Sequence, residues 1–410
     1  MTMAIEQVDL FSPAFKANPY PTYSWLRENG PVYRATLPDG QTMWVVTRYA
    51  DVVAVFKDER FVKDFRNAMT SAQIEELSLP IHSREFRLLT GHMLSSDPAD
   101  HTRLRALVSK GFTPRRIEQL RPRIQQVADD LLAALQERGE MDLIADFAFP
   151  LPMIVISELL GIPEADHDQF RDWSSTIINH LGSGPLDPET MAAAQAFGTY
   201  LQQLARARRA APTDDLISAL VATEGQGDQL NEDELLAMLF LLIVAGHETT
   251  VNLIGNGVLA LLQHPDQLAK LRQEPALIAG AIEEFLRYDG SVETSTFRYA
   301  REDIEFRGQH ITKGERVLVV IAAADHDPEQ FAQPEDLDIM RAINRHVAFG
   351  QGIHYCLGAP LARLEGQIAI NTLLRRLPTL RLAVDDKLLH WRPGLLMRGL
   401  YALPVAYDVA

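Results

Sequence analysis

The chain has 410 residues, of which 47% are hydrophobic and 23% are charged, as in an ordinary soluble globular protein. Its formal net charge of −16 argues against a nucleic-acid-binding protein, which usually presents a basic face. The single cysteine excludes an intrachain disulfide framework and fits a reducing compartment. The N-terminus lacks a signal-peptide pattern, and the longest apolar run, residues 235–246, is too short for a membrane span. We therefore expect a cytoplasmic protein without a membrane anchor.

The N-terminal part predicts short helices and strands in alternation. Residues 19–29 favour a helix with prolines near its start. Residues 31–37 and 42–48 alternate like strands, and "LPDGQ" between them is typical of a hairpin turn. Residues 49–58 return to helical spacing.

From about residue 96 to residue 263 the pattern is mostly helical. Helical periodicity covers residues 97–112 and 114–137, and residues 181–190 predict a loop between helices. Asn231 is a candidate N-cap, with Glu234 three residues on as in a capping box. The helix that follows spans about 30 residues, or roughly 45 Å. It is apolar on nearly every face in its first half, so we expect it to be buried near the centre.

The remaining segments are shorter. The sequence predicts helices over residues 275–290 and 359–377, strands over residues 292–300, 303–308 and 315–323, and an extended C-terminal region over residues 400–409. No repeat or flexible linker divides the chain. The expected fold class is mainly α with small β-sheets (α+β), in one domain over residues 1–410.

The only cysteine, Cys356, lies in the segment "FGQGIHYCLG", directly before the last predicted helix. The unpaired N–H groups and the positive end of that helix favour negative charge on sulfur. Gly350, Gly352 and Gly358 allow a bulky or flat partner to approach the backbone. Three interpretations compete: a buried cysteine in a tight loop, a nucleophile with His354 as its base, and an axial thiolate ligand of haem iron.

The pattern Phe-Gly-x-Gly-x-His-x-Cys-x-Gly, from Phe349 to Gly358, resembles the haem-thiolate loop of the cytochromes P-450, with all six fixed positions matched. The resemblance implies that Cys356 is the proximal ligand of haem b, with Phe349 and Gly350 beside the cofactor. It extends in the family's order from "NPYPTYSWLRENGPVYR" through the central helix to the last helix.

The central helix carries "AGHETT", which is similar to the family's oxygen-activating segment. The resemblance implies that Ala245 and Gly246 lie over the haem, with Gly246 opening the helix locally. Thr249 then holds oxygen or an ordered water, and Glu248 relays protons. A packing glycine and a solvated glutamate are the alternatives. A zinc-protease site would need a second histidine where Val251 stands, so we reject it.

Glu284 and Arg287 lie one helical turn apart, which alone predicts an ordinary surface ion pair. The resemblance instead implies a buried pair supporting the cysteine loop. The family's third partner is often an arginine, but the nearest match, "PEDL", places Asp336 there and leaves that partner unidentified.

Haem propionates need cations or hydrogen-bond donors. The resemblance implies that four residues, which are otherwise surface side chains, hold them: His101, Arg105, Arg298 and His354.

The implied activity is insertion of one oxygen atom from O₂ into a lipophilic small molecule. No Rossmann fingerprint is seen and the chain has no room for a fused flavin domain, so we expect electrons from a separate ferredoxin or flavodoxin with its NAD(P)H reductase. A local basic patch could dock that partner: Arg103, Lys110, Arg115, Arg116 and Arg363. An H₂O₂-dependent peroxygenase and a non-enzymatic haem sensor are the alternatives. By analogy with the family, the substrate pocket is lined by Phe86, Leu89, Leu241, Val244, Ala245, Thr294 and Met397.

Overall fold

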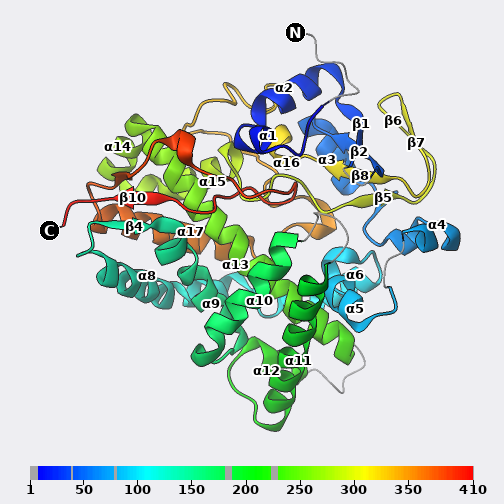
Figure 1. The fold of residues 1–410 in the computed structure, drawn as a ribbon, viewed down its shortest axis with the longest axis horizontal. Coiled ribbons are helices and arrows are strands. Elements are labelled where there is room, and N and C mark those ends of the chain that lie inside the picture. The colour runs from blue at the N-terminus through cyan, green and yellow to red at the C-terminus, as the bar shows by residue number, and fades with distance from the viewer. Residues whose placement is uncertain (1–7, 38–39, 78–80, 181–186, 223–229, 410) are drawn as a thin grey trace.

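The structure is a computed structural model that describes residues 8–37, 40–77, 81–180, 187–222 and 230–409 (Figure 1). Helices make up most of it, and they are α1 (Pro13–Ala17), α2 (Tyr20–Asn29), α3 (Tyr49–Lys57), α4 (Ser71–Glu76), α5 (Arg84–Thr90), α6 (Asp100–Ser109), α7 (Pro114–Gln119), α8 (Arg121–Leu135), α9 (Pro150–Leu160), α10 (His167–His180), α11 (Pro188–Ala210), α12 (Leu216–Val221), α13 (Glu232–Gln263), α14 (Pro265–Gln273), α15 (Ile278–Tyr288), α16 (Ile321–Asp325) and α17 (Ala359–Arg376). The prediction of a mainly helical α+β fold is confirmed.

The strands form three small sheets. They are β1 (Val32–Thr36), β2 (Thr42–Val46), β3 (Phe61–Val62), β4 (Glu140–Asp142), β5 (Arg298–Ala300), β6 (Ile304–Phe306), β7 (Gln309–Ile311), β8 (Arg316–Val319), β9 (Arg381–Leu382) and β10 (Pro404–Ala406). The largest sheet has the order β1-β2-β8-β5-β3, in which only β2 and β8 run parallel. β4, β10 and β9 form the second sheet, and β6 and β7 form a hairpin. The first two predicted strands do pair antiparallel, but residues 38–39 of their predicted turn lie outside the described residues.

Helix α13 lies near the middle of the molecule, between the sheets and the lower helices in Figure 1. It begins with the predicted capping box, in which Asn231 accepts from the Glu234 backbone and the Glu234 side chain accepts from the Asn231 backbone. Its 32 residues span roughly 48 Å. By length and composition alone, α13 is long and apolar enough to cross a membrane. However, 83% of its apolar window is buried inside the structure, as in a core helix. The absence of a membrane anchor stays a prediction.

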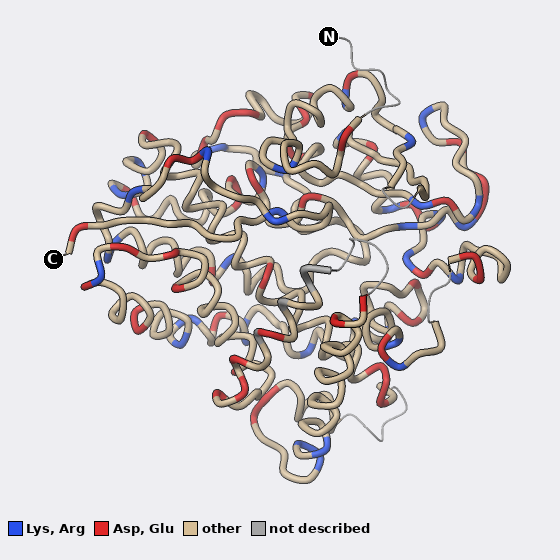
Figure 2. Tube along the Cα trace, viewed as in Figure 1, with Lys and Arg blue, Asp and Glu red and all other residues tan. Residues whose placement is uncertain are grey.

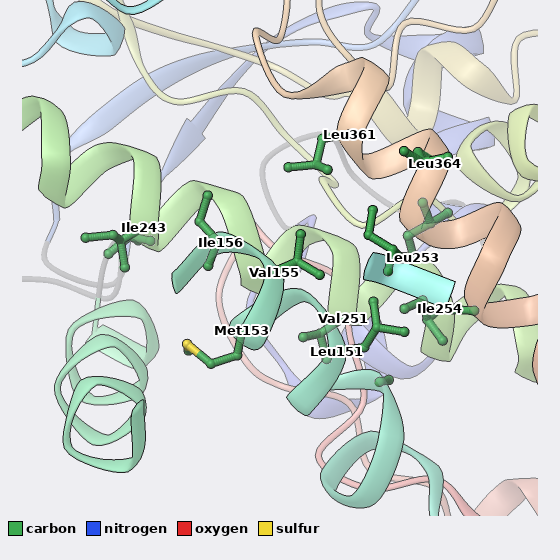
Figure 3. Close-up of a cluster of buried hydrophobic side chains, with 14 of the residues drawn as sticks. Leu151, Met153, Val155, Ile156, Ile243, Val251, Leu253, Ile254, Leu361 and Leu364 are labelled. Atoms are coloured by element: carbon green, nitrogen blue, oxygen red, sulfur yellow. The ribbon is translucent and has the colours of Figure 1, made fainter. Parts of the chain in front are cut away.

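Helix α13 is held by helices from distant parts of the chain. It packs against α5, α9, α15 and α17. Figure 3 shows one such cluster, in which side chains from α9, α13 and α17 meet: Leu151, Met153, Val155, Ile156, Ile243, Val251, Leu253, Ile254, Leu361 and Leu364. This packing fixes the central helix relative to α17, which begins just after Cys356. That the whole chain is a single domain stays a prediction.

Three predicted elements differ from the structure. The helix predicted over residues 114–137 is two helices, because the chain turns at Leu120 and Pro122 starts α8. The strand predicted over residues 315–323 ends at Val319, and the alanine-rich end forms helix α16 instead. Of residues 292–300 only β5 is a strand, although Val292 and Thr294 form isolated bridges. Residues 181–186 of the predicted loop lie outside the described residues.

Candidate active site

The cysteine loop is shaped by its glycines. Gly350 and Gly352 have positive φ angles of 68° and 71°, a region that side chains with a Cβ rarely adopt. A Cβ on Gly352 would also lie 2.9 Å from the carbonyl oxygen of Phe56. The Cys356 backbone N–H donates to the Phe349 carbonyl at 2.9 Å and closes the loop.

The Cys356 thiol lies where the sequence placed it, at the start of α17. The backbone N–H groups of Gly358 and Ala359 donate to its sulfur, and Arg105 and Arg363 add positive charge nearby. Burial is the stronger effect and raises the pKa of the Cys356 thiol. The side chain nevertheless has an exposed surface. The Cys356 thiol is thus surrounded by protein and still accessible.

Helix α13 has one accessible face. Between Leu235 and Leu261, every residue of α13 is buried except Ala245, Gly246 and Thr249. These three lie at positions i, i+1 and i+4, so they share one side of the helix. The single gap in an otherwise buried helix falls on the segment that the sequence singled out.

The expected opening of the helix at Gly246 is not seen, because α13 is continuous from Glu232 to Gln263. The Thr249 hydroxyl donates to the Ala245 carbonyl at 2.9 Å, within the helix. A Cβ on Gly246 would lie 3.1 Å from the Ile156 side chain of α9. Gly246 therefore allows the close packing of α9 on α13.

Glu248 is buried, with 1% of its surface exposed. Its Oε1 lies 3.4 Å from Nη1 of Arg392, and its Oε2 has no hydrogen-bond partner among the described residues. A buried carboxylate needs a cation or donors to remain ionised. The partner Arg392 comes from the C-terminal region and was not expected from the sequence.

The four residues predicted to hold propionates converge. The rings of His101 and His354 are 4.3 Å apart, and neither ring nitrogen of His101 has a partner among the described residues. Arg298 donates through Nη1 to the Phe61 carbonyl at 3.0 Å, while its Nε has no partner in the part of the chain that the structure describes. Arg105 donates to the Tyr355 carbonyl at 2.7 Å.

A fifth residue of this cluster, Lys63, directly follows β3 and was missed by the sequence analysis. It is buried and donates to the carbonyls of Thr296 and Phe297. Burial, followed by Lys63, His101 and the two arginines, lowers the pKa of His354 to about 2. Burial also lowers the pKa of Arg298 to about 10. Nothing in the local sequence of Lys63 indicates this role, since β3 reaches the cluster only through its pairing with β5.

Two buried, unpartnered donors among several cations fit a ligand with acidic groups, such as the two propionates of haem. A protein-only metal site does not fit, since no group of three or more His, Cys, Asp or Glu among the described residues could hold an ion. One accessible thiol suits a metal that is already held by a macrocycle. The residues present therefore fit haem b.

Glu284 and Arg287 form a fully buried pair, joined by two hydrogen bonds of 2.8 and 2.9 Å. The third partner is Arg341, whose Nε donates to Glu284 Oε2 at 3.0 Å. Asn344 donates to the same oxygen at 3.0 Å. Asp336 stands where the sequence pattern placed the third partner. It contributes only its backbone carbonyl, which accepts hydrogen bonds from Arg287 and Arg341.

The residues predicted to line the pocket fall into two groups. Phe86 and Leu89 lie on α5. This helix packs against α13, the helix that carries Leu241 and Val244. Thr294 donates to the Leu395 carbonyl at 3.1 Å, and Met397 bridges Val292, so both belong to the region around β8 and the C-terminal segment. A surface hollow of about 470 Å³ between α10 and α11 is lined by none of these residues.

Two members of the predicted basic patch are already paired. Arg103 contacts Glu234 and Asp100, and Arg363 makes two hydrogen bonds to Glu283, of 2.7 and 2.8 Å. Figure 2 shows acidic and basic residues interspersed along the trace. Lys110, Arg115 and Arg116 are exposed and remain available as basic surface.

The chain matches the family model described as Cytochrome P-450 over residues 183–397. It is 49% identical to Cytochrome P-450 107B1 of Saccharopolyspora erythraea, over 96% of both chains. It is 46% identical to the Vitamin D(3) 25-hydroxylase of Pseudonocardia autotrophica, over 98% of this chain and 97% of that one. The crystal structure of the myxobacterial cytochrome P-450 CYP267B1 with myristic acid superposes with a TM-score of 0.91. That protein is 44% identical, with 97% of this chain and 98% of the other covered.

These matches extend over nearly the whole chain, including the cysteine loop and the central helix. The solved relative shares the mainly helical fold with small sheets. The chain therefore belongs to the cytochrome P-450 family, and it is an oxidoreductase of the monooxygenase type with haem b as its cofactor.

Proposed function

We propose that this protein inserts one atom of O₂ into a lipophilic small molecule, using electrons from a separate ferredoxin or flavodoxin system in the cytoplasm. The observation that carries the proposal is the single open face of α13, with Ala245, Gly246 and Thr249, in a molecule whose only thiol is also accessible inside the fold.

The sulfur of Cys356 would bind the haem iron, and Phe349 and Gly350 would shape the loop around it. His101, Arg105, Arg298 and His354 would hold the propionates, a set to which we add Lys63. When bound, a thiolate-ligated haem supplies the electron density that favours cleavage of the O–O bond. The amides at the start of α17 would stabilise the negative charge on the Cys356 sulfur.

Protons must reach the oxygen site, because the second oxygen atom leaves as water. Thr249 lies on the open face of α13, where its hydroxyl can hold oxygen or an ordered water. Glu248, the residue directly before Thr249, is buried and paired with Arg392. A buried acid next to an alcohol can take a proton from solvent and pass it inward.

A lipophilic substrate is supported by the apolar residues expected around the site, among them Phe86, Leu89, Leu241 and Val244. It is also supported by the relatives, one of which is named for 25-hydroxylation of vitamin D(3), while a second was solved with myristic acid. Thr294 and Met397 would complete the wall from the opposite side of the site.

For electron delivery, we infer a docking surface that includes Lys110, Arg115 and Arg116. Arg103 and Arg363 hold acids of this chain, so they contribute less free charge than the sequence suggested. Reversing the charges at Arg115 and Arg116 should slow reduction by the partner. The difference in reduction rate between the variant and the wild type should shrink at high salt, because salt screens the charges.

The test combines spectra with turnover. The purified holoprotein, reduced and exposed to CO, should give the red-shifted band of a thiolate ligand, and Cys356→Ser should lose it. Optical titration with fatty acids and sterols should then identify compounds that displace water from the iron. NADH with redox partners should support product formation with these compounds. Product from H₂O₂ alone at the same rate would instead indicate a peroxygenase, and binding without any product would indicate a sensor.

A further inference from the structure

A line of buried polar side chains runs along one side of α13, starting at Glu248. Asn252 and Asn256 follow at intervals of four residues, so all three lie on the same face. Each is 1% exposed. Each also has one buried atom without a hydrogen-bond partner among the described residues: Glu248 Oε2, Asn252 Nδ2 and Asn256 Oδ1. Such atoms are uncommon inside proteins and usually have a role.

The C-terminal hairpin, residues 390–401, covers this line. Its two strands are joined by the Trp391–Leu400 bridge. Gly399 lies directly on Asn252, since a Cβ there would be 2.0 Å from Asn252 Oδ1. The Arg398 carbonyl accepts from Asn256 Nδ2 at 3.0 Å. The hairpin is therefore in direct contact with the buried polar face.

Arg392 connects this hairpin to Glu248. Its guanidinium lies 3.4 Å from the carboxylate and 5.6 Å from the ring centre of Tyr401, and its Nε donates to the Leu400 carbonyl at 3.2 Å. The Arg392 side chain is 20% exposed, whereas that of Glu248 is 2% exposed. Arg392 thus reaches from the protein surface to the one buried carboxylate next to Thr249.

We propose that Arg392 is a positioning residue for Glu248, and that protons enter from solvent beneath the C-terminal hairpin. This rests on the proposed role of Glu248. Arg392 holds the Glu248 carboxylate in place through the 3.4 Å contact. Glu248 accepts a proton from water that enters beside Arg392 and releases one towards Thr249, so that its charge is restored after each transfer.

If Arg392 had only a structural role, its substitution would give a different result. In that case its loss would loosen the hairpin and lower the melting temperature, but it would leave the sensitivity of turnover to D₂O unchanged. A positioning role makes proton transfer slower, so the solvent isotope effect must rise as the rate falls.

The experiment uses the holoenzyme with NADH, redox partners and myristic acid, and measures NADH oxidation in H₂O and in D₂O. Arg392→Met should slow oxidation by about 10- to 100-fold, as expected when a reacting group is misplaced. Its solvent isotope effect should increase, and Arg392→Lys should restore most of the rate. The matched control is Arg381→Met, which breaks an exposed pair with Asp408 in the same region and should change neither quantity.

The variant Glu248→Gln separates the two proposals. If it oxidises NADH like the wild type, the proposed role of Glu248 fails and this inference fails with it. If Glu248→Gln is slow but Arg392→Met matches the control, only the inference about Arg392 is overturned. If both act through one path, the double variant should be no slower than Glu248→Gln alone, and additive losses would contradict the proposal. The CO spectrum checks that each variant retains the thiolate ligand.

Discussion

Glu365 on α17 gives the protein a stability that depends on pH. The side chain is 1% exposed, and neither carboxyl oxygen has a hydrogen-bond partner of good geometry among the described residues. Burial raises the pKa of Glu365 from 4.5 to about 8, while the nearby hydroxyl of Thr250 opposes the rise. At neutral pH the folded protein therefore holds this carboxyl protonated, whereas the unfolded chain ionises it.

The sign and size follow from linkage. Because the folded pKa of Glu365 is the higher one, its contribution to stability is complete below pH 4.5 and is lost as the pH rises towards 8. Each pH unit between these two pKa values lowers the free energy of unfolding by about 1.4 kcal/mol. Between pH 5 and pH 8 the loss is about 3.5 kcal/mol. For a chain of this length the unfolding entropy is about 0.9 kcal/mol per degree, so the melting temperature changes by about 4 °C.

Glu365→Gln tests this reasoning, since glutamine resembles the protonated acid and does not titrate. At pH 5 the variant and the wild type should melt within about 1 °C of each other, and at pH 8 the variant should melt about 4 °C higher. Differential scanning calorimetry of the holoprotein from pH 5 to pH 8 measures the difference. The control Glu76→Gln, at an exposed position of α4, should show no such trend. A flat difference between Glu365→Gln and the wild type would refute the argument.

Three further outcomes are expected. Arg341→Met leaves the buried Glu284 with one cation fewer and should lower the stability by about 3 kcal/mol, the low end for breaking a buried pair. The melting temperature should then fall by roughly 3 °C. An unchanged melting temperature would mean that Asn344 alone is enough to hold Glu284 beside Arg287. Arg298→Met should speed haem transfer to apomyoglobin about tenfold, as expected for one lost charged hydrogen bond, and an unchanged rate would remove Arg298 from the proposed propionate cluster. Thr249→Ala should still oxidise NADH but release most of the electrons as H₂O₂, measured by peroxide assay; full coupling to product would show that the hydroxyl is not needed.

The sequence predicted those features whose physics is local. The capping box of Asn231 and Glu234 depends on four successive residues and formed as expected. The cysteine loop depends on the conformations of its glycines and on the helix that starts directly after it. Both can be predicted from residues 349–358 and the residues that follow them. The buried character of α13 followed from its composition. In each case the residues that determine the structure are neighbours in the chain.

The features that were missed depend on contacts between distant segments. Arg341 reaches Glu284 across 57 residues, and Lys63 reaches Thr296 across 233. Arg103 looked like a free cation until Glu234, 131 residues away, was found beside it. No pattern within a window of helical or strand length contains such pairs. The third cation of the buried pair and the real charge of the basic patch therefore required the folded structure.

Three successive residues of α13 show how much chemistry one buried helix can separate. Successive residues point about 100° apart around a helix axis. Glu248 therefore faces the C-terminal hairpin, Thr249 lies on the accessible face, and Thr250 lies near Glu365 on α17. The proposed proton entry, the proposed oxygen site and the contact with Glu365 thus lie on different sides of the same helix. It follows that substitutions at these adjacent positions should act differently. Changes at Glu248 should alter the proton-dependent rate and changes at Thr249 the fate of electrons. Changes at Thr250 should alter the dependence of stability on pH.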